Sequence, residues 1–308
     1  MLRPSLKKAL MDNRPFESLN QAQRERLAFV EFRLWFLGDV RRPDLMDRFG
    51  IAPAVATRDL SAYRKLAPQN IEFDERRKVY VPGENFEPLF EHRPERVMSA
   101  LSRGFGGSLG EVTSGYLRCD FPLRLNQPPL AELSIITRAI HQQRAVRLTY
   151  HSLNNGPSER EIVPFALVDS GLRWHARVFD RVSQEFRDLV ITRMEAPVML
   201  PPEPIPAPEQ RDSDIQWSRI VELELQPHPA QARPEIVARD FAMAGGFLKL
   251  KVRAAIVGYV LQQWNVDCSP DHSLDPTRYR LWLSDPQVLY GVQNAVLAPG
   301  YQAQPKLR

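Results

Sequence analysis

The sequence predicts a multidomain α+β protein, in which a helical N-terminal domain with a hairpin precedes a strand-rich central domain and a mixed C-terminal domain. Three observations predict this. Apolar residues recur at helical spacing through residues 18–66, short alternating runs fill 130–196, and the twelve residues 197–208 include six prolines. Proline disfavours helix and interior strand, so that last segment is the clearest linker. The predicted boundaries are 1–83, a helical or loop connector 84–129, 130–196, a linker 197–218, and 219–308.

Composition places the chain among globular proteins, with 43% hydrophobic and 25% charged residues. No apolar run is long enough to predict a membrane span, and the first fifteen residues lack the apolar core of a secretory signal. The two cysteines, Cys119 and Cys268, are too few and too far apart for a disulfide scaffold. We therefore expect a cytoplasmic protein.

Positive charge is concentrated at the N-terminal end. Residues 1–80 contain 16 basic and 11 acidic side chains, whereas the remainder contains 25 basic and 26 acidic ones. A basic module on a neutral body indicates a polyanionic partner for that module. An ordinary solvated surface is the alternative.

The N-terminal pattern predicts three helices and a hairpin. A capping box at Ser18-Leu-Asn-Gln21 opens the first helix, which ends at Gly38. Pro43 begins the second helix, Gly50 makes a tight turn, and the third helix covers 53–66. Strands follow at 71–74 and 78–81. The predicted inward side chains are Leu27, Val30, Leu34 and Leu37 in the first helix, Leu45, Met46 and Phe49 in the second, and Ala56, Leu60 and Tyr63 in the third.

This order of elements is that of a winged helix-turn-helix. A helix in the major groove needs small residues to approach the bases and hydrogen-bonding side chains to distinguish them, and the face of the third helix opposite its apolar stripe supplies both. The hairpin tip supplies cations for phosphates. The predicted DNA-binding residues are Arg42, Ala54, Thr57, Arg58, Ser61, Lys65, Arg76, Arg77 and Lys78. A plain three-helix bundle with a solvated third helix is the alternative.

Four alternating runs predict the strands of a small central barrel: 145–151, 161–168, 172–179 and 186–191. Pro164 within the second run indicates an edge or a bulge. The run Leu172–Phe179 places His175 and Arg177 on one face and Trp174, Ala176 and Val178 on the other.

Five segments carry a resemblance to a known family. They are the opening helix Leu133-Ser-Ile-Ile-Thr-Arg-Ala-Ile140, the strand Val146-Arg-Leu-Thr-Tyr150, and the runs Ile162-Val-Pro-Phe165, Arg173-Trp-His-Ala-Arg177 and Phe186-Arg-Asp-Leu-Val-Ile-Thr-Arg193. With these segments, the region 130–196 resembles a WYL domain, a small Sm-like β-barrel. Its namesake tripeptide is replaced here by Trp174-His175-Ala176. Most of the chain is similar to WYL regulators of phage-defence operons, the BrxR and CapW type. The resemblance implies that the α+β region 219–308 is a dimerisation extension.

Donors and positive charge gather on the short central strands. The predicted ligand-binding residues are Tyr150, Ser152, His175, Arg177, Arg187 and Arg193. Guanidinium groups suit phosphate or carboxylate, so we expect an anionic ligand, and the resemblance points to a nucleotide or single-stranded nucleic-acid fragment. Arginines that merely face water, with a structural His175, are the alternative.

Enzymatic motifs are missing from the sequence. It has no P-loop, HExxH or GxSxG pattern, and the glycine-rich run 104–110 does not match the dinucleotide fingerprint. We predict no catalytic, metal or cofactor site. The expected protein is a homodimeric repressor of a phage-defence operon that binds a palindromic double-stranded operator and is relieved by the anionic ligand. The alternatives are an activator of the same build and a nucleic-acid sensor with no promoter role.

Overall fold

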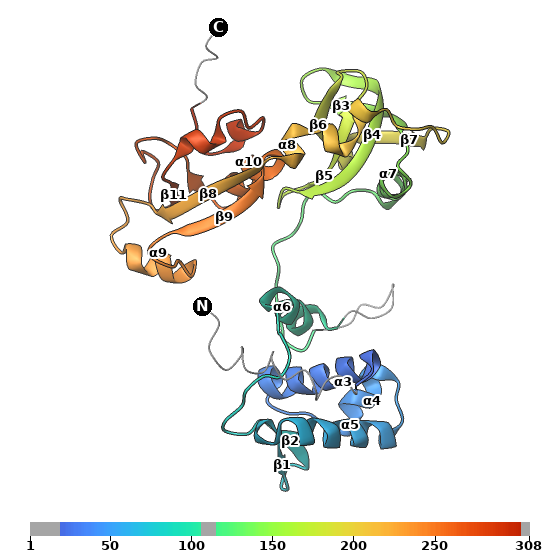
Figure 1. Ribbon diagram of the computed structural model, residues 1–308, viewed down its shortest axis with the longest axis vertical. Helices are drawn as coiled ribbons and strands as arrows, with labels where there is room; N and C mark the ends of the chain where they lie inside the picture. Colours follow the sequence, from blue (N-terminus) through green and yellow to red (C-terminus); the bar gives the residue numbers. More distant parts are fainter. Residues whose placement is uncertain (1–18, 106–114, 303–308) are drawn as a thin grey trace. The chain divides into compact units, whose positions relative to one another are not determined.

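The computed structural model describes residues 19–105 and 115–302 and divides into two compact units, Met1–Phe121 and Pro122–Arg308 (Figure 1). The first unit contains the predicted helices and hairpin. The second contains two sheets, each with its own apolar core. Nowhere in the described ranges is a helix both long and apolar enough to cross a membrane.

The first helix of the N-terminal unit, α3, covers Gln21–Phe32 and continues as a π-helical turn, η1, over Arg33–Leu37. Gly38 ends it in the left-handed conformation, with φ of 81°, as the sequence predicts. The predicted cap Ser18 lies outside the described residues. The cap is instead Asn20, whose side chain accepts a hydrogen bond from the Gln23 amide at 2.8 Å.

The helix-turn-helix consists of α4, Arg42–Phe49, and α5, Pro53–Leu66, joined through Gly50 with φ of 61°. The predicted apolar stripe of α5 is confirmed, because Ala56, Leu60 and Tyr63 are all buried. These side chains pack against apolar residues of α3 and α4 in one core. The α5 face opposite the stripe is left exposed.

The hairpin pairs β1, Glu72–Asp74, with β2, Val79–Val81, and we call residues 72–81 the wing. A short 3-10 turn, η2, covers Pro68–Asn70 before it, and helix α6 covers Pro94–Arg103 after it. The wing is joined to the loop before α4 by a two-residue bridge between Val40 and Tyr80.

A buried carboxylate, Glu31 of α3, joins three segments of the N-terminal unit. It accepts hydrogen bonds from the Tyr63 hydroxyl of α5 at 2.8 Å and from the backbone amides of Leu89 and Phe90 at 2.7 and 2.9 Å. The His92 ring lies 2.9 Å from it. Residues 89–92 are therefore fastened to the same core as the three helices.

The central region has five antiparallel strands in the order β6-β5-β4-β3-β7, beside helix α7, Leu130–Gln142 (Figure 1). Their bounds are Val146–Ser152 for β3, Gly156–Asp169 for β4, Trp174–Asp180 for β5, Glu185–Val190 for β6 and Met194–Met199 for β7, with a 3-10 turn η3 at Ile191–Arg193. The four predicted strands are present, and β4 has a register shift between Pro164 and Ala166, as its proline indicates. Pro197 lies in β7, an edge strand that tolerates proline.

The predicted barrel closure is not found. Among the described residues β7 pairs only with β3, and β6 pairs only with β5, so the sheet is open. Closure would need hydrogen bonds between the two outer strands, β6 and β7. The alternation of the sequence predicted the strands themselves, but it contains no signal for pairing between the first and last strands of a sheet.

The C-terminal region is the predicted α+β unit, with a sheet in the order β10-β11-β8-β9. Helix α10 contributes Ala254, Val257 and Leu261 to the core beneath it. The strands are β8, Ile220–Pro227; β9, Leu248–Arg253; β10, Val266–Asp267; and β11, Leu281–Leu283. The helices and 3-10 turns are η4, Ala207–Glu209; η5, Arg211–Ser213; α8, Ile215–Ser218; α9, Pro234–Asp240; α10, Ala254–Gln263; η6, Pro286–Leu289; and η7, Ala295–Leu297.

Candidate functional site

The exposed face of α5 carries five of the predicted DNA-binding residues. All five are solvent-exposed and share one side of the helix: Ala54, Thr57, Arg58, Ser61 and Lys65. The Thr57 hydroxyl donates a hydrogen bond to the Pro53 carbonyl at 3.0 Å. In the described ranges neither Arg58 nor Lys65 has an ion-pair partner, so both cations are available to a ligand.

The back of α5 is fixed by a charged contact that the sequence analysis missed. Asp59 is buried and pairs with Arg26 of α3 at 2.6 Å, and the Gln23 side chain donates to it at 3.3 Å. Buried ion pairs hold two elements in one orientation when the geometry is good. The contact therefore links α3 to the buried side of α5, beside the apolar stripe.

The remaining predicted DNA-binding residues occupy the start of α4 and the wing tip. Arg42, the first residue of α4, is exposed. In the wing, Asp74 accepts hydrogen bonds from the backbone amides of Arg76 and Arg77, both at 2.9 Å, which fixes the turn. Lys78 pairs with Glu75 at 2.6 Å, and Arg77 pairs with Asp39 at 3.2 Å.

The six predicted ligand-binding residues make different local contacts in the structure. Tyr150 is buried, and its hydroxyl accepts a hydrogen bond from the Val190 amide at 3.2 Å. Ser152 accepts from the amides of the turn after β3, while Arg187 is exposed and pairs with Glu185 at 2.7 Å. His175 and Arg177 share one face of β5, as the alternation predicts, but that face is covered. Whether these residues bind a ligand remains a prediction.

Arg177 lies in a buried ion cluster between the central sheet and the C-terminal region. It makes a bidentate contact with Asp214 at 2.8 and 3.1 Å, and it lies 3.3 Å from Asp188 of β6. Asp188 also accepts from the Tyr259 hydroxyl of α10 at 3.0 Å. Burial raises the pKa of Asp188 although Arg177 opposes the shift. We call Arg177, Asp188, Asp214 and Tyr259 the junction cluster.

His175 adjoins the junction cluster through an aromatic contact. Its ring stacks on that of Tyr259, with centroids 5.1 Å apart and an interplanar angle of 28°. Burial, followed by the positive charge of Arg173, lowers the pKa of His175 to about 4. Its Nδ1 atom is buried and has no hydrogen-bond partner within the described ranges.

Arg173 was not among the predicted residues, although it has the same strand parity as His175, two positions away. Arg173 and Arg193 both lie close enough to His175 to lower its pKa. Neither has an ion pair with any residue of 19–105 or 115–302. Asn126 donates to the hydroxyl of Thr192, the residue before Arg193, at 2.9 Å, while its own Oδ1 is buried without a partner among the described residues. Positive charge therefore lies close to the buried Nδ1 atom of His175, which has no partner within the described ranges.

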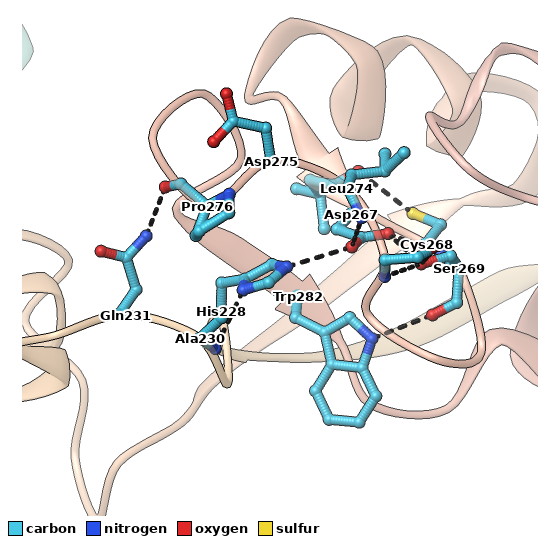
Figure 2. Close-up of polar contacts among 12 residues, drawn as sticks. His228, Ala230, Gln231, Asp267, Cys268, Ser269, Leu274, Asp275, Pro276 and Trp282 are labelled. Carbon is cyan, nitrogen blue, oxygen red and sulfur yellow. Dashed lines mark hydrogen bonds and ion pairs between the residues drawn. The ribbon is translucent and has the colours of Figure 1, made fainter.

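The C-terminal region contains a second buried polar network, drawn in Figure 2. Since Nδ1 of His228 accepts from the Ala230 amide at 3.1 Å, its Nε2 carries the proton and donates to Asp267 at 3.2 Å. Asp267 also accepts from the amide and hydroxyl of Ser269, at 2.7 and 2.6 Å. Both ring nitrogens of His228 are engaged in hydrogen bonds within this network. Ser269, His228 and Asp267 therefore form a structural network and are not arranged as a nucleophile and its base.

Three domain families match this chain in the order of its folded regions. They are the BrxR transcriptional regulator winged helix-turn-helix domain over residues 22–103, the WYL domain over 131–199, and the BrxR transcriptional regulator C-terminal dimerization domain over 220–289. Together they span both units and include α5, the wing and the junction cluster apart from Asp214.

Relatives that match over most of this chain agree with these matches. The DNA-binding transcriptional repressor CapW of Escherichia coli (strain KTE188) is 30% identical over 281 residues, which cover 88% of this chain and 91% of the relative. CapW of Pseudomonas aeruginosa is 32% identical over 256 residues, covering 80% and 83%. Among solved structures, the proteasome accessory factor B/C of Arthrobacter aurescens is 15% identical, with a TM-score of 0.25, over 90% of this chain and 46% of that one. That TM-score is too low to bear on the fold.

Proposed function

This chain belongs to the CapW family of DNA-binding transcriptional repressors, and from that premise we propose that it represses a phage-defence operon by binding a palindromic double-stranded operator as a homodimer. The exposed α5 face carries this proposal. Its small residue Ala54 permits close approach to base edges, and Arg58 has no ion-pair partner in the described ranges that would compete with a base. The match of residues 220–289 to a dimerization domain supports the twofold arrangement that a palindrome requires.

Replacing Arg58 by alanine should weaken operator binding by about 1–3 kcal/mol, or about 5- to 150-fold, for each half-site, because one base-edge contact is lost in each. Binding to random duplex should change much less. The operator can be located by footprinting DNA upstream of the chain's own gene, and affinities measured by fluorescence anisotropy. The matched control is Arg138→Ala, an exposed arginine of α7, for which wild-type affinity is expected. Wild-type operator affinity in Arg58→Ala would contradict the proposed role of α5.

The central domain is the proposed sensor of an anionic ligand, a nucleotide or a short single strand, whose binding lowers operator affinity. Support comes from the surroundings of His175, where Arg173 and Arg193 gather positive charge with no ion-paired carboxylate among the described residues. A ligand releases the operator only if it binds the DNA-incompetent state more tightly. Typical coupling between two sites changes affinity about 5- to 150-fold.

Titration of the protein–operator complex with short single-stranded oligonucleotides and nucleotides tests the sensor. We expect Arg193→Ala to bind operator as the wild type does but to need at least about tenfold more oligonucleotide for release, because a charge-assisted hydrogen bond is lost. Arg138→Ala serves again as the arginine control. If no anion releases the wild-type complex, the central domain is a connector and not this sensor. If Arg193→Ala responds as the wild type does, Arg193 is not part of the anion site.

A further inference from the structure

The wing is fastened to the body of the N-terminal unit by the two residues that follow Gly38. Val40 exchanges both backbone hydrogen bonds with Tyr80 of β2, at 3.0 and 3.1 Å, so it extends the hairpin as a third short strand. Its neighbour Asp39 is thereby held against the wing side chains. The left-handed turn at Gly38 makes this return of the chain possible.

Asp39 belongs to a charge-balanced group of four side chains, which we call the wing-anchor network. Its carboxylate oxygens lie 3.1 Å from Arg33 and 3.2 Å from Arg77. Arg33 reaches a second carboxylate, that of Asp44, at 3.3 Å. Two guanidinium groups therefore neutralise two carboxylates. Only Arg77 is largely solvent-accessible, with 54% of its side chain exposed against 14–22% for the other three.

This pairing of two arginines with two carboxylates opposes any movement of the Arg77 side chain from Asp39 to a DNA phosphate. If Arg77 left, Asp39 and Asp44 would have only Arg33 as an ion-pair partner among the described residues, and a net negative charge would face the DNA backbone. The other two wing cations carry no such restraint. Lys78 pairs only with the exposed Glu75, a type of surface pair that contributes little, and the Arg76 side chain has no ion-pair partner in the described residues.

We propose that Arg77 is a positioning residue that Asp39 holds to fix the wing, and that Arg76 supplies the wing's phosphate contact. This inference rests on the proposed DNA-binding function. It separates two neighbouring arginines that the sequence alone treats alike. It also makes Asp39 a restraint on DNA affinity, since neutralising it would free Arg77 for a phosphate.

The salt dependence of binding to a short random-sequence duplex tests this, because its slope counts the phosphates that cations neutralise. We expect Arg76→Gln to flatten the slope of log affinity against log salt by about 0.9 for each wing in contact. Arg77→Gln should leave the slope at the wild-type value. Asp39→Asn should steepen it by up to about 0.9 per wing, and adding Arg77→Gln to Asp39→Asn should return it to wild type.

Asp47→Asn is the matched control for the lost negative charge. Asp47 is exposed on α4 without an ion pair in the described ranges, and its replacement should leave the slope unchanged. The inference is overturned if Arg77→Gln flattens the slope as Arg76→Gln does, if Arg76→Gln leaves it unaltered, or if Asp39→Asn fails to steepen it. If the wild type binds no duplex at any salt concentration, the proposed function fails and the inference fails with it. Normal wild-type binding with the wrong pattern among variants rejects the inference alone.

Discussion

Replacing Arg177 by methionine should lower the free energy of unfolding of the second unit by about 3–5 kcal/mol. The arginine is buried and is the only cation that pairs with Asp188 and Asp214 among the described residues. Methionine keeps most of the volume but leaves two buried carboxylates without a countercharge. Removing one member of a buried ion pair costs far more than the intact pair contributes, because the remaining charge has lost both water and partner.

Chemical denaturation followed by tryptophan fluorescence measures this change, because four of the five tryptophans, Trp174, Trp217, Trp264 and Trp282, lie in the second unit. Arg187→Met is the matched control. Arg187 is on the neighbouring strand, but its pair with Glu185 is exposed, so we expect a loss below about 1 kcal/mol. Adding Asp188→Asn to Arg177→Met should restore part of the stability. An Arg177→Met protein as stable as the control would mean that the cluster does not hold the two regions together.

The second large effect is a dependence of stability on pH that originates at His175. Its pKa in the folded protein is about 4, against an ordinary value of 6.5. Between these two values the unfolded chain binds the proton and the folded one does not. The free energy of unfolding therefore rises with pH through this window. The contribution of His175 to it is fully present above about pH 6.5 and is lost as pH falls towards 4. The shift corresponds to about 3 kcal/mol.

His175→Phe should remove this dependence, because phenylalanine keeps a ring against Tyr259 and has no titratable proton. The measurement is the free energy of unfolding at a series of pH values, compared as the difference between variant and wild type. That difference should change by about 3 kcal/mol between pH 7 and pH 4 in favour of the variant. His141→Gln, an exposed position on α7, should follow the wild-type curve. Parallel curves for His175→Phe and wild type would show that the imidazole is not held neutral.

Local patterns in the sequence account for much of the N-terminal unit. The bounds of α5, the glycines that end η1 and α4, and the exposed face of α5 follow from spacing and from turn residues, which act within a few positions. The same turn residues are ambiguous where two nearby positions could both cap a helix. Ser18 and Asn20 are both good cap residues, and only the structure shows Asn20 in that role.

Contacts between distant positions account for most of what the sequence did not predict. An arginine on a strand has the same appearance in a sequence whether its partner is water, a ligand or a carboxylate far along the chain. Arg177 meets Asp214, 37 positions away, and Arg77 meets Asp39, 38 positions away. Strand parity correctly placed His175 and Arg177 together, but it carries no information about which region of the chain covers that face.

The carboxylate of Glu31 has a consequence for how the chain is made. Three of its hydrogen-bond donors lie in Leu89, Phe90 and His92, about 60 positions after it in the order of synthesis. When α3, α4, α5 and the wing have left the ribosome, their shared core still contains a carboxylate that lacks those donors. A nascent chain halted just after the wing should therefore remain loosely packed. The winged helix-turn-helix unit completes its core only when residues 89–92 emerge, so its folding is timed by the connector and not by α4 and α5.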